Sequence, residues 1–328
     1  MMTKTLNHSN RTDRPFRLGR LVSALTLGVA LLGNVSQAAA DDCSTVKFAD
    51  VGWTDITATT AVTSEVLQGL GYETKTNLLS VPVTYTTLAN GSIDVFLGNW
   101  MPTMEADIAK YAADGSVETV RANLEGARYT LAVPKYVYDA GVKSFADLVT
   151  HADKFKSRIY GIEPGNDGNR LIQQMIDENA FGLGDFSIVE SSEAGMVSQV
   201  SRAVKRENWI VFLGWAPHPM NASFELEYLS GGDDYFGPNF GGASVYTNVR
   251  KGYRESCPNV GRLLTNLGFT LELENEVMAA ILDQDKKPET AARDWLKANP
   301  QVLDTWLEGV TTLDGQNGLA AVRQHLGL

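Results

Sequence analysis

The chain has 328 residues, of which 44% are hydrophobic, 20% charged and 9% aromatic. This composition excludes a disordered, collagen-like or coiled-coil protein, and the length predicts about two domains, because single cores stop growing at roughly 250 to 300 residues. Beyond residue 40 the chain has 23 basic and 38 acidic residues, a net charge of −15. Such a surface repels nucleic acid and anionic lipid, so neither is an expected partner, whereas a cation is electrostatically favoured.

The N-terminus has the pattern of a secretory signal peptide. Basic residues precede an apolar run, and the small side chains of Ala38 and Ala40 suit a cleavage site, so residues 1–40 form the predicted signal peptide. A transmembrane anchor would need about 18 or more apolar residues. A lipid anchor on Cys43 would need small residues directly before it, where the chain has two aspartates. We therefore expect a periplasmic protein.

Cys43 and Cys257 are the only cysteines in the sequence. In the oxidising compartment that a signal peptide implies, such a pair tends to form a disulfide. A bond that closes a loop of more than 200 residues is therefore expected. Two free buried thiols are the alternative.

Short apolar runs alternate with segments of helical periodicity along most of the chain. The runs that indicate strands are VKFADVGW, IDVFLGNW, YTLAVP, IYGIEPG and WIVFLGW, and helices are expected over 58–70, 104–113, 170–179 and 193–207. This succession predicts an α/β fold with mainly parallel strands. A glycine-rich stretch over 231–242 indicates a flexible connection, and further helices are expected over 272–283, 289–297 and 319–326.

Three tryptophans occupy equivalent places in this pattern. Trp53, Trp100 and Trp215 each follow an apolar run and have a glycine within two residues. Ligands of open α/β sheets bind beyond the carboxyl ends of strands, so two separate sheets that each present tryptophan there would form a cleft. Indole faces attract cations, quaternary ammonium groups above all. The pattern predicts an aromatic cage for a cation, with an ordinary core position as the alternative for any one ring.

Two polar residues lie near these tryptophans, and enzyme motifs are absent from the sequence. Asp55 either caps the following helix or accepts a ligand hydroxyl, and Asn166 either shapes the GNDGN turn or faces the cleft. The sequence has no phosphate-binding loop and no GxSxG, HExxH or CxxC motif. We therefore predict no catalytic residue, no metal site and no cofactor.

Longer motifs make the chain resemble a known family. GWTDITA, LSVPVTY, DVFLGNWMP, YGIEPGNDGN and VFLGWAPHPMN are similar to segments of the substrate-binding proteins of glycine betaine/choline ABC importers, and the likeness spans residues 46–326. The resemblance implies an α/β, two-lobed periplasmic binding protein (Venus-flytrap) fold, type II-like, with two chain crossovers. Lobe one is expected at residues 41–132 and 240–328, and lobe two at 133–239.

The resemblance also implies roles for individual residues. It implies that Cys43 and Cys257 are bridged, and it adds Tyr129, which the strand pattern alone does not single out. The ligand-binding residues that it implies are Trp53, Trp100, Tyr129 and Trp215 around a trimethylammonium group, with Asp55 and Asn166 at a hydroxyl end.

The charge of Asp55 bears on the choice of ligand. An ionised Asp55 would repel the carboxylate of glycine betaine or carnitine, whereas choline offers a hydroxyl and no negative charge. The expected protein is a monomeric importer component that binds choline, and acetylcholine more weakly, for a permease and its ATPase. His218 would meet a carboxylated ligand unless it is structural. A betaine or carnitine binder, a sensory module and a choline-ester enzyme are the alternatives.

Overall fold

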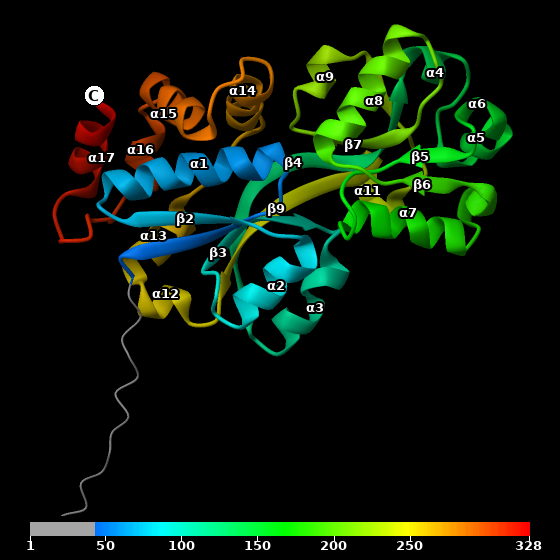
Figure 1. Ribbon diagram of the computed structural model, residues 1–328. Helices are drawn as coiled ribbons and strands as arrows, with labels where there is room; N and C mark the ends of the chain where they lie inside the picture. The colour runs from blue at the N-terminus through cyan, green and yellow to red at the C-terminus, as the bar shows by residue number, and fades with distance from the viewer. Residues whose placement is uncertain (1–42) are drawn as a thin grey trace, which may run out of the picture. The chain divides into compact units, whose positions relative to one another are not determined.

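The computed structural model describes residues 43–328, so the predicted signal peptide lies outside the described residues. Nine strands join into one mixed sheet in the order β2-β1-β3-β9-β4-β7-β5-β6, with β8 paired to β4 (Figure 1). The strands are β1 (Thr45–Asp50), β2 (Glu73–Leu78), β3 (Val95–Met101), β4 (Val117–Pro134), β5 (Arg158–Tyr160), β6 (Ser187–Val189), β7 (Phe212–Ala216), β8 (Leu226–Tyr228) and β9 (Gly242–Arg250).

Helices of very different length surround this sheet. The first group is α1 (Thr54–Gly69), α2 (Val81–Ala89), α3 (Glu105–Ala113), α4 (Lys135–Asp139), α5 (Phe145–Thr150), α6 (Ala152–Phe155), α7 (Asp167–Asp177), the 3-10 helix η1 (Ala180–Asp185) and α8 (Glu193–Lys205). The second group is α9 (Met220–Ser223), α10 (Asp233–Phe236), α11 (Pro238–Gly241), α12 (Tyr253–Ser256), α13 (Pro258–Asn266), α14 (Leu271–Leu282), α15 (Pro288–Ala298), α16 (Val302–Trp306) and α17 (Gly318–Leu326). Within residues 43–328, no helix is long and apolar enough to cross a membrane.

Strand β4 runs through both halves of the sheet. Residues 117–128 pair antiparallel with β9, and residues 128–132 pair antiparallel with β7. Strand β1 is parallel to β2 and β3, and β5 is parallel to β6 and β7. The expectations of mainly parallel strands and of two separate sheets are therefore wrong, because two long antiparallel strands, β4 and β9, join one set of parallel strands to the other.

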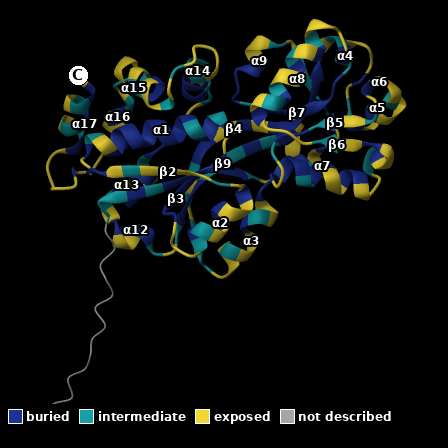
Figure 2. Cartoon of the chain, viewed as in Figure 1, coloured by how far each residue is buried: buried dark blue, intermediate teal, exposed yellow. Residues whose placement is uncertain are grey.

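We call β1, β2, β3 and β9 with α1 the first half, and β5, β6 and β7 with α7 and α8 the second half. In Figure 1 these two groups lie toward opposite ends of β4. Helix α1 packs against α14, α15 and α17 as well as the sheet, and twelve of its sixteen residues are buried, as its dark colour in Figure 2 shows. A helix buried on most sides has little amphipathic pattern, which is why the predicted start at residue 58 was four residues late.

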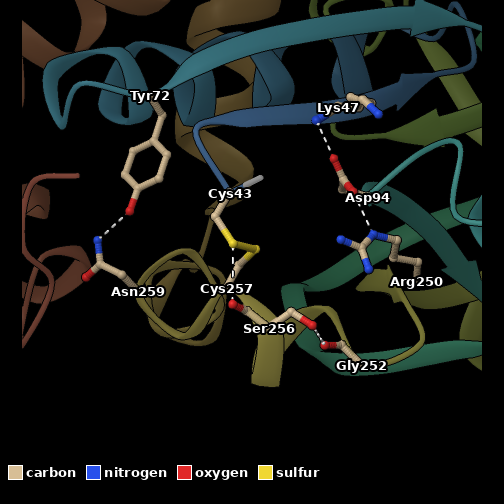
Figure 3. Close-up of a disulfide and its surroundings, with 9 residues drawn as sticks. All are labelled: Cys43, Lys47, Tyr72, Asp94, Arg250, Gly252, Ser256, Cys257 and Asn259. Atoms are coloured by element: carbon tan, nitrogen blue, oxygen red, sulfur yellow. Dashed lines mark hydrogen bonds and ion pairs between the residues drawn. A yellow bond between two sulfur atoms is a disulfide. The ribbon is translucent and has the colours of Figure 1, made fainter. Parts of the chain in front are cut away.

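The disulfide between Cys43 and Cys257 is confirmed (Figure 3). It joins the residues before β1 to the junction of α12 and α13, with the two Cα atoms 5.6 Å apart. Nearby, the carboxylate of Asp94 accepts hydrogen bonds from the Lys47 amide at 2.9 Å and the Arg250 Nε at 2.7 Å. In the chain-entropy treatment a bridge over so long a loop contributes about 5 kcal/mol. These contacts hold β1, β3 and β9 of the first half together.

The glycine-rich stretch over 231–242 is not the flexible connection that its composition indicates. It forms the short helices α10 and α11, and Phe236 within it is fully buried. The Phe236 ring packs edge-on against Tyr129, with centroids 5.9 Å apart. The segment therefore supports the site described next.

Candidate functional site

Four aromatic rings that come from distant parts of the chain enclose one cavity. Its lining residues are Trp53, Asp55, Trp100, Tyr129, Ile162 and Trp215. The centroid of the Tyr129 ring lies 6.0 Å from that of Trp100 and 6.3 Å from that of Trp215. Each of the four aromatic residues is at most 5% exposed. The cavity between them is small, about 20 Å³, and the rings form most of its wall. We call the four rings the aromatic cage.

Strand ends position two of the cage residues, and the start of a helix positions a third. Trp100 and Trp215 are the second-last residues of β3 and β7, and each is followed by a cis X-Pro bond, at Pro102 and Pro217. Trp53 is not at a strand end, because β1 ends at Asp50 and Trp53 is the N-cap residue of α1. Strand ends and a helix start therefore converge on the same cavity.

Asp55 is the polar group of the cavity. Its Oδ2 accepts a hydrogen bond from Nε1 of Trp100 at 3.0 Å, and its Oδ1 has no partner among the described residues although it is buried. The helix-cap interpretation of Asp55 is wrong, because it lies inside the first turn of α1 and caps nothing. The structure thus leaves one buried carboxyl oxygen free beside the four rings.

The surroundings of Asp55 change its affinity for a proton. Burial, and next the negative charge of Glu193, raise the pKa of Asp55 to about 8. A carboxyl group with this pKa carries its proton more readily near neutral pH than an exposed aspartate does. A cation placed beside it would favour the ionised form, so ionisation becomes a consequence of binding.

Asn166 reaches the site indirectly. It is the N-cap of α7, where its Oδ1 accepts the Asn169 amide hydrogen at 2.8 Å and its Nδ2 donates to the Glu163 carbonyl. The same Oδ1 accepts a long hydrogen bond, 3.5 Å, from the Tyr129 hydroxyl. Asn166 is not among the six residues that line the cavity, so the turn interpretation holds and its contact with the site runs through Tyr129.

Gly168 allows α7 to approach the cage closely. A Cβ atom at this position would lie 2.0 Å from the Tyr129 hydroxyl oxygen and 2.7 Å from the ring carbon that carries it. No real Cβ can tolerate that distance, so the residue must be glycine for Tyr129 to keep its place.

Sequence reasoning missed two carboxylates that surround Trp53. Glu163 Oε1 accepts a hydrogen bond from Trp53 Nε1 at 2.6 Å, and Glu193 binds the next residue, Thr54. Glu163 lies in the predicted strand run IYGIEPG and beyond the observed end of β5 at Tyr160, so its place near a strand end was an available signal. Glu193 was not detectable, because an acid in the first turn of a helix is an ordinary feature.

His218 has a structural role, which was one of its two interpretations from the sequence; the other was contact with a carboxylated ligand. Its Nδ1 accepts the Met220 amide hydrogen at 2.9 Å, its Nε2 lies 3.1 Å from Glu193 Oε1, and it is 2% exposed. It does not line the cavity. Within residues 43–328, no group of three or more histidine, cysteine or acidic side chains is placed to hold a metal ion.

The chain is similar to proteins of known structure over most of its length. Residues 44–298 match the family described as the substrate binding domain of ABC-type glycine betaine transport systems. An ABC-transporter choline binding protein solved with choline is 62% identical, over 87% of this chain and 99% of its own, with a TM-score of 0.86. Such a protein in an unliganded semi-closed conformation has the same identity and coverage and a TM-score of 0.81.

A more distant structure extends the comparison. Lactococcal OpuAC, closed and complexed with glycine betaine, is 30% identical over 80% of this chain and 98% of its own, with a TM-score of 0.73. The chain therefore has the two-lobed fold of these binding proteins, and its conformation is more similar to the choline-bound structure than to the unliganded one.

Proposed function

Because the chain belongs to the family of substrate-binding domains of ABC-type glycine betaine transport systems, we propose that it is the periplasmic choline-binding component of an ABC importer. The family consists of ligand-binding domains and not of enzymes. The observation that carries the proposal is the aromatic cage with one unpartnered carboxyl oxygen of Asp55 beside it. A trimethylammonium group and a hydroxyl are the two groups that such a site can take.

The magnitudes fit a binding protein. Each indole or phenol face contributes roughly 0.5 to 2 kcal/mol to holding a cation, so four faces supply roughly 2 to 8 kcal/mol. Micromolar binding needs about 8 kcal/mol. A hydroxyl that donates to the buried Oδ1 of Asp55 would add about 1.5 to 3 kcal/mol, as hydrogen bonds to charged groups do. The cage therefore supplies most of the affinity and Asp55 the remainder.

The polar end favours choline over carboxylated relatives in a manner that depends on pH. Choline brings a positive charge and no negative one, so it stabilises ionised Asp55. Glycine betaine and carnitine bring a carboxylate, which an ionised Asp55 repels and which only the neutral form can meet with a hydrogen bond. Acetylcholine has no hydroxyl to donate and is the weaker cationic ligand.

Ligand binding is proposed to close two lobes. We divide the chain into lobe one, residues 41–132 and 240–328, and lobe two, residues 133–239. The pairing of β4 with β9 up to residue 128 and with β7 from residue 128 supports a division near this point. Trp53 and Trp100 then belong to one lobe and Trp215 to the other. A ligand that touches rings of both lobes favours the closed state, which a monomer presents to the permease and its ATPase.

Titration calorimetry tests the proposal. The mature protein, stripped of bound ligand by unfolding and refolding, is titrated with choline, acetylcholine, glycine betaine and carnitine at pH 7.5. We expect micromolar or tighter choline binding and weaker binding of the other three. Tighter binding of a carboxylated ligand would overturn the choice of choline, and absence of binding by all four would overturn the proposal.

Two further measurements separate transport from other uses of the same site. Loss of choline uptake on deletion of the gene supports the importer role, whereas unchanged uptake would make the protein a sensory module. Hydrolysis of acetylcholine by the purified protein would reveal an esterase, and we expect none.

A further inference from the structure

The N-terminus of α1 has no side-chain cap of its own, although it carries two residues of the site. The first amide groups of a helix lack partners within the helix, and Ser, Thr, Asp or Asn at the N-cap usually accepts a hydrogen bond from one of them. In α1 the N-cap residue is Trp53, which makes no side-chain cap. The helix end that positions Trp53 and Asp55 is therefore incomplete within the first half.

The second half supplies the missing acceptor. Glu193, in the first turn of α8, accepts a hydrogen bond from the Thr54 amide to Oε2 at 2.8 Å and another from the Thr54 hydroxyl to Oε1 at 2.5 Å. The two residues are 139 positions apart, and Glu193 is only 5% exposed. A buried carboxylate that loses such partners, and is not hydrated instead, destabilises the protein. These two hydrogen bonds can therefore form only while Glu193 of α8 lies against the start of α1.

Glu193 is in turn held from the cage side. The Nδ1 of His218 accepts the Met220 amide hydrogen, so in neutral His218 it is Nε2 that carries the hydrogen and donates to Glu193. The His218 ring packs on Trp215 with centroids 4.9 Å apart and planes at 73°. A continuous path thus runs from Trp215 through His218 and Glu193 to Thr54, which stands between Trp53 and Asp55.

We propose that Glu193 is a positioning residue that couples occupancy of the aromatic cage to closure, by capping α1 from the opposite half of the molecule. When the halves separate, Glu193 and the start of α1 each become hydrated. When they meet, the cap forms and sets the positions of Trp53 and Asp55. This inference rests on the proposed binding function for its role, but the cap itself does not depend on which ligand is bound.

Other polar contacts link the same two parts of the chain, among them those of Arg170 and Glu163. Arg170 donates to the Asp107 carboxylate at 2.8 Å, but its side chain is 38% exposed, so water can replace its partner. Glu163 accepts a hydrogen bond from the Trp53 indole and has none to the backbone of α1. Only Glu193, of these three, completes the helix end.

Ligand dissociation measured by stopped-flow tryptophan fluorescence tests the coupling. We expect Glu193→Ala to release choline about 10 to 30 times faster than the wild type, with an association rate within about threefold, because bonds to a buried charge are lost only from the closed state. Thr54→Val should give a smaller increase, and Thr54→Ser, which keeps the hydroxyl, should restore the wild-type rate. Glu225→Ala, an exposed acid of the second half, is the control.

A second readout is hydrogen exchange of the amides at the start of α1, measured in the free protein and with choline bound. In the wild type these amides should exchange more slowly with choline, and Glu193→Ala should lose that protection, while exchange in the core strands stays unchanged. If wild-type protein binds none of the quaternary ammonium ligands, the proposed function fails, and slower exchange in the free wild type than in free Glu193→Ala still reports the cap. Equal dissociation rates, or equal exchange at α1 with choline bound, in Glu193→Ala and wild type would overturn the inference.

Discussion

Trp100 and Trp215 are the second-last residues of two strands of nearly the same sequence, yet different interactions hold their rings in place. The indole of Trp100 donates to a buried carboxyl group, Asp55, in its own half. The ring of Trp215 packs edge-on between Tyr129 and His218, with centroids 6.3 and 4.9 Å away. The repeated strand end therefore places a ring, while the neighbours decide its chemistry: one side of the cage is coupled to a titrating group and the other to aromatic packing.

Truncation of each ring should break this comparison most strongly. Trp100→Ala and Trp215→Ala should each weaken choline binding by at least ~1 kcal/mol, with a larger loss for Trp100, because Asp55 then also loses its hydrogen-bond donor. Trp100→Phe and Trp215→Phe keep a ring and remove the indole N–H. Calorimetry should show a loss of about 2 kcal/mol for Trp100→Phe and a smaller one for Trp215→Phe. Equal losses in the two Phe variants would contradict the difference between the two strand ends.

Asp55→Asn should sharpen the role of the carboxyl group. We expect choline binding to weaken by about 1.5 to 2 kcal/mol and glycine betaine binding to change less, because the amide keeps the hydrogen bond of Trp100 and removes the negative charge. Calorimetry with both ligands checks the ranking. A larger loss for betaine than for choline would remove the reason for preferring choline.

Asp55 should also make ligand binding depend on pH, with opposite directions for choline and glycine betaine. Since burial raises the pKa of Asp55 to about 8, choline binding below pH 8 should release a proton, so choline affinity should rise toward pH 8 by at most about tenfold per unit. Betaine affinity should fall over the same range. Calorimetry between pH 6 and 9 measures both slopes, and Asp55→Asn is the control in which the Asp55 contribution disappears.

The stability of the protein without ligand should fall as the pH rises, whereas its choline affinity should rise. The folded-state pKa of Asp55 lies above its usual value of 3.8, so the folded state binds one more proton than the unfolded state between these pH values, and stability falls as the pH rises from 3.8 to about 8. Asp55→Asn removes this cost. Its gain in melting temperature should be larger at pH 8 than at pH 5 in thermal unfolding experiments, and a gain independent of pH would argue against the raised pKa.

Gly168→Ala should have the smallest effect, because it acts on the cage only through Tyr129. The added methyl group overlaps the Tyr129 hydroxyl, and overpacking of this kind costs about 1 to 3 kcal/mol. About 1 kcal/mol of this cost should appear as weaker choline binding, and the rest as a lower free energy of unfolding. Gly268→Ala, where an added Cβ meets nothing within 4 Å, is the matched control. Equal behaviour of the two variants would show that Tyr129 can move without loss.

Local sequence was a good guide to the rings and a poor guide to their polar partners. The strands that end in Trp100 and Trp215 were recognised because a short apolar run followed by Gly and Trp is visible in a few residues. Asp55 could not be distinguished from a helix cap, because the buried first turn of α1 hides the start of the helix. For Asn166 the sequence left a turn role and a cleft role open, and the structure shows the N-cap of α7 with a contact to the site through Tyr129.

By itself, the sequence determined the α/β class, the acidic character of the chain and the places of Trp100 and Trp215 near strand ends, because these follow from composition and from patterns within about ten residues. It made a disulfide the expected state of the two cysteines without excluding free thiols. Only the tertiary structure decided that β4 and β9 join all the strands into one sheet, that Asp55 is buried with a raised pKa, and that Glu193 caps α1 from 139 residues away. Burial, pKa and long-range hydrogen bonds depend on which distant segments meet, and no local pattern specifies that meeting.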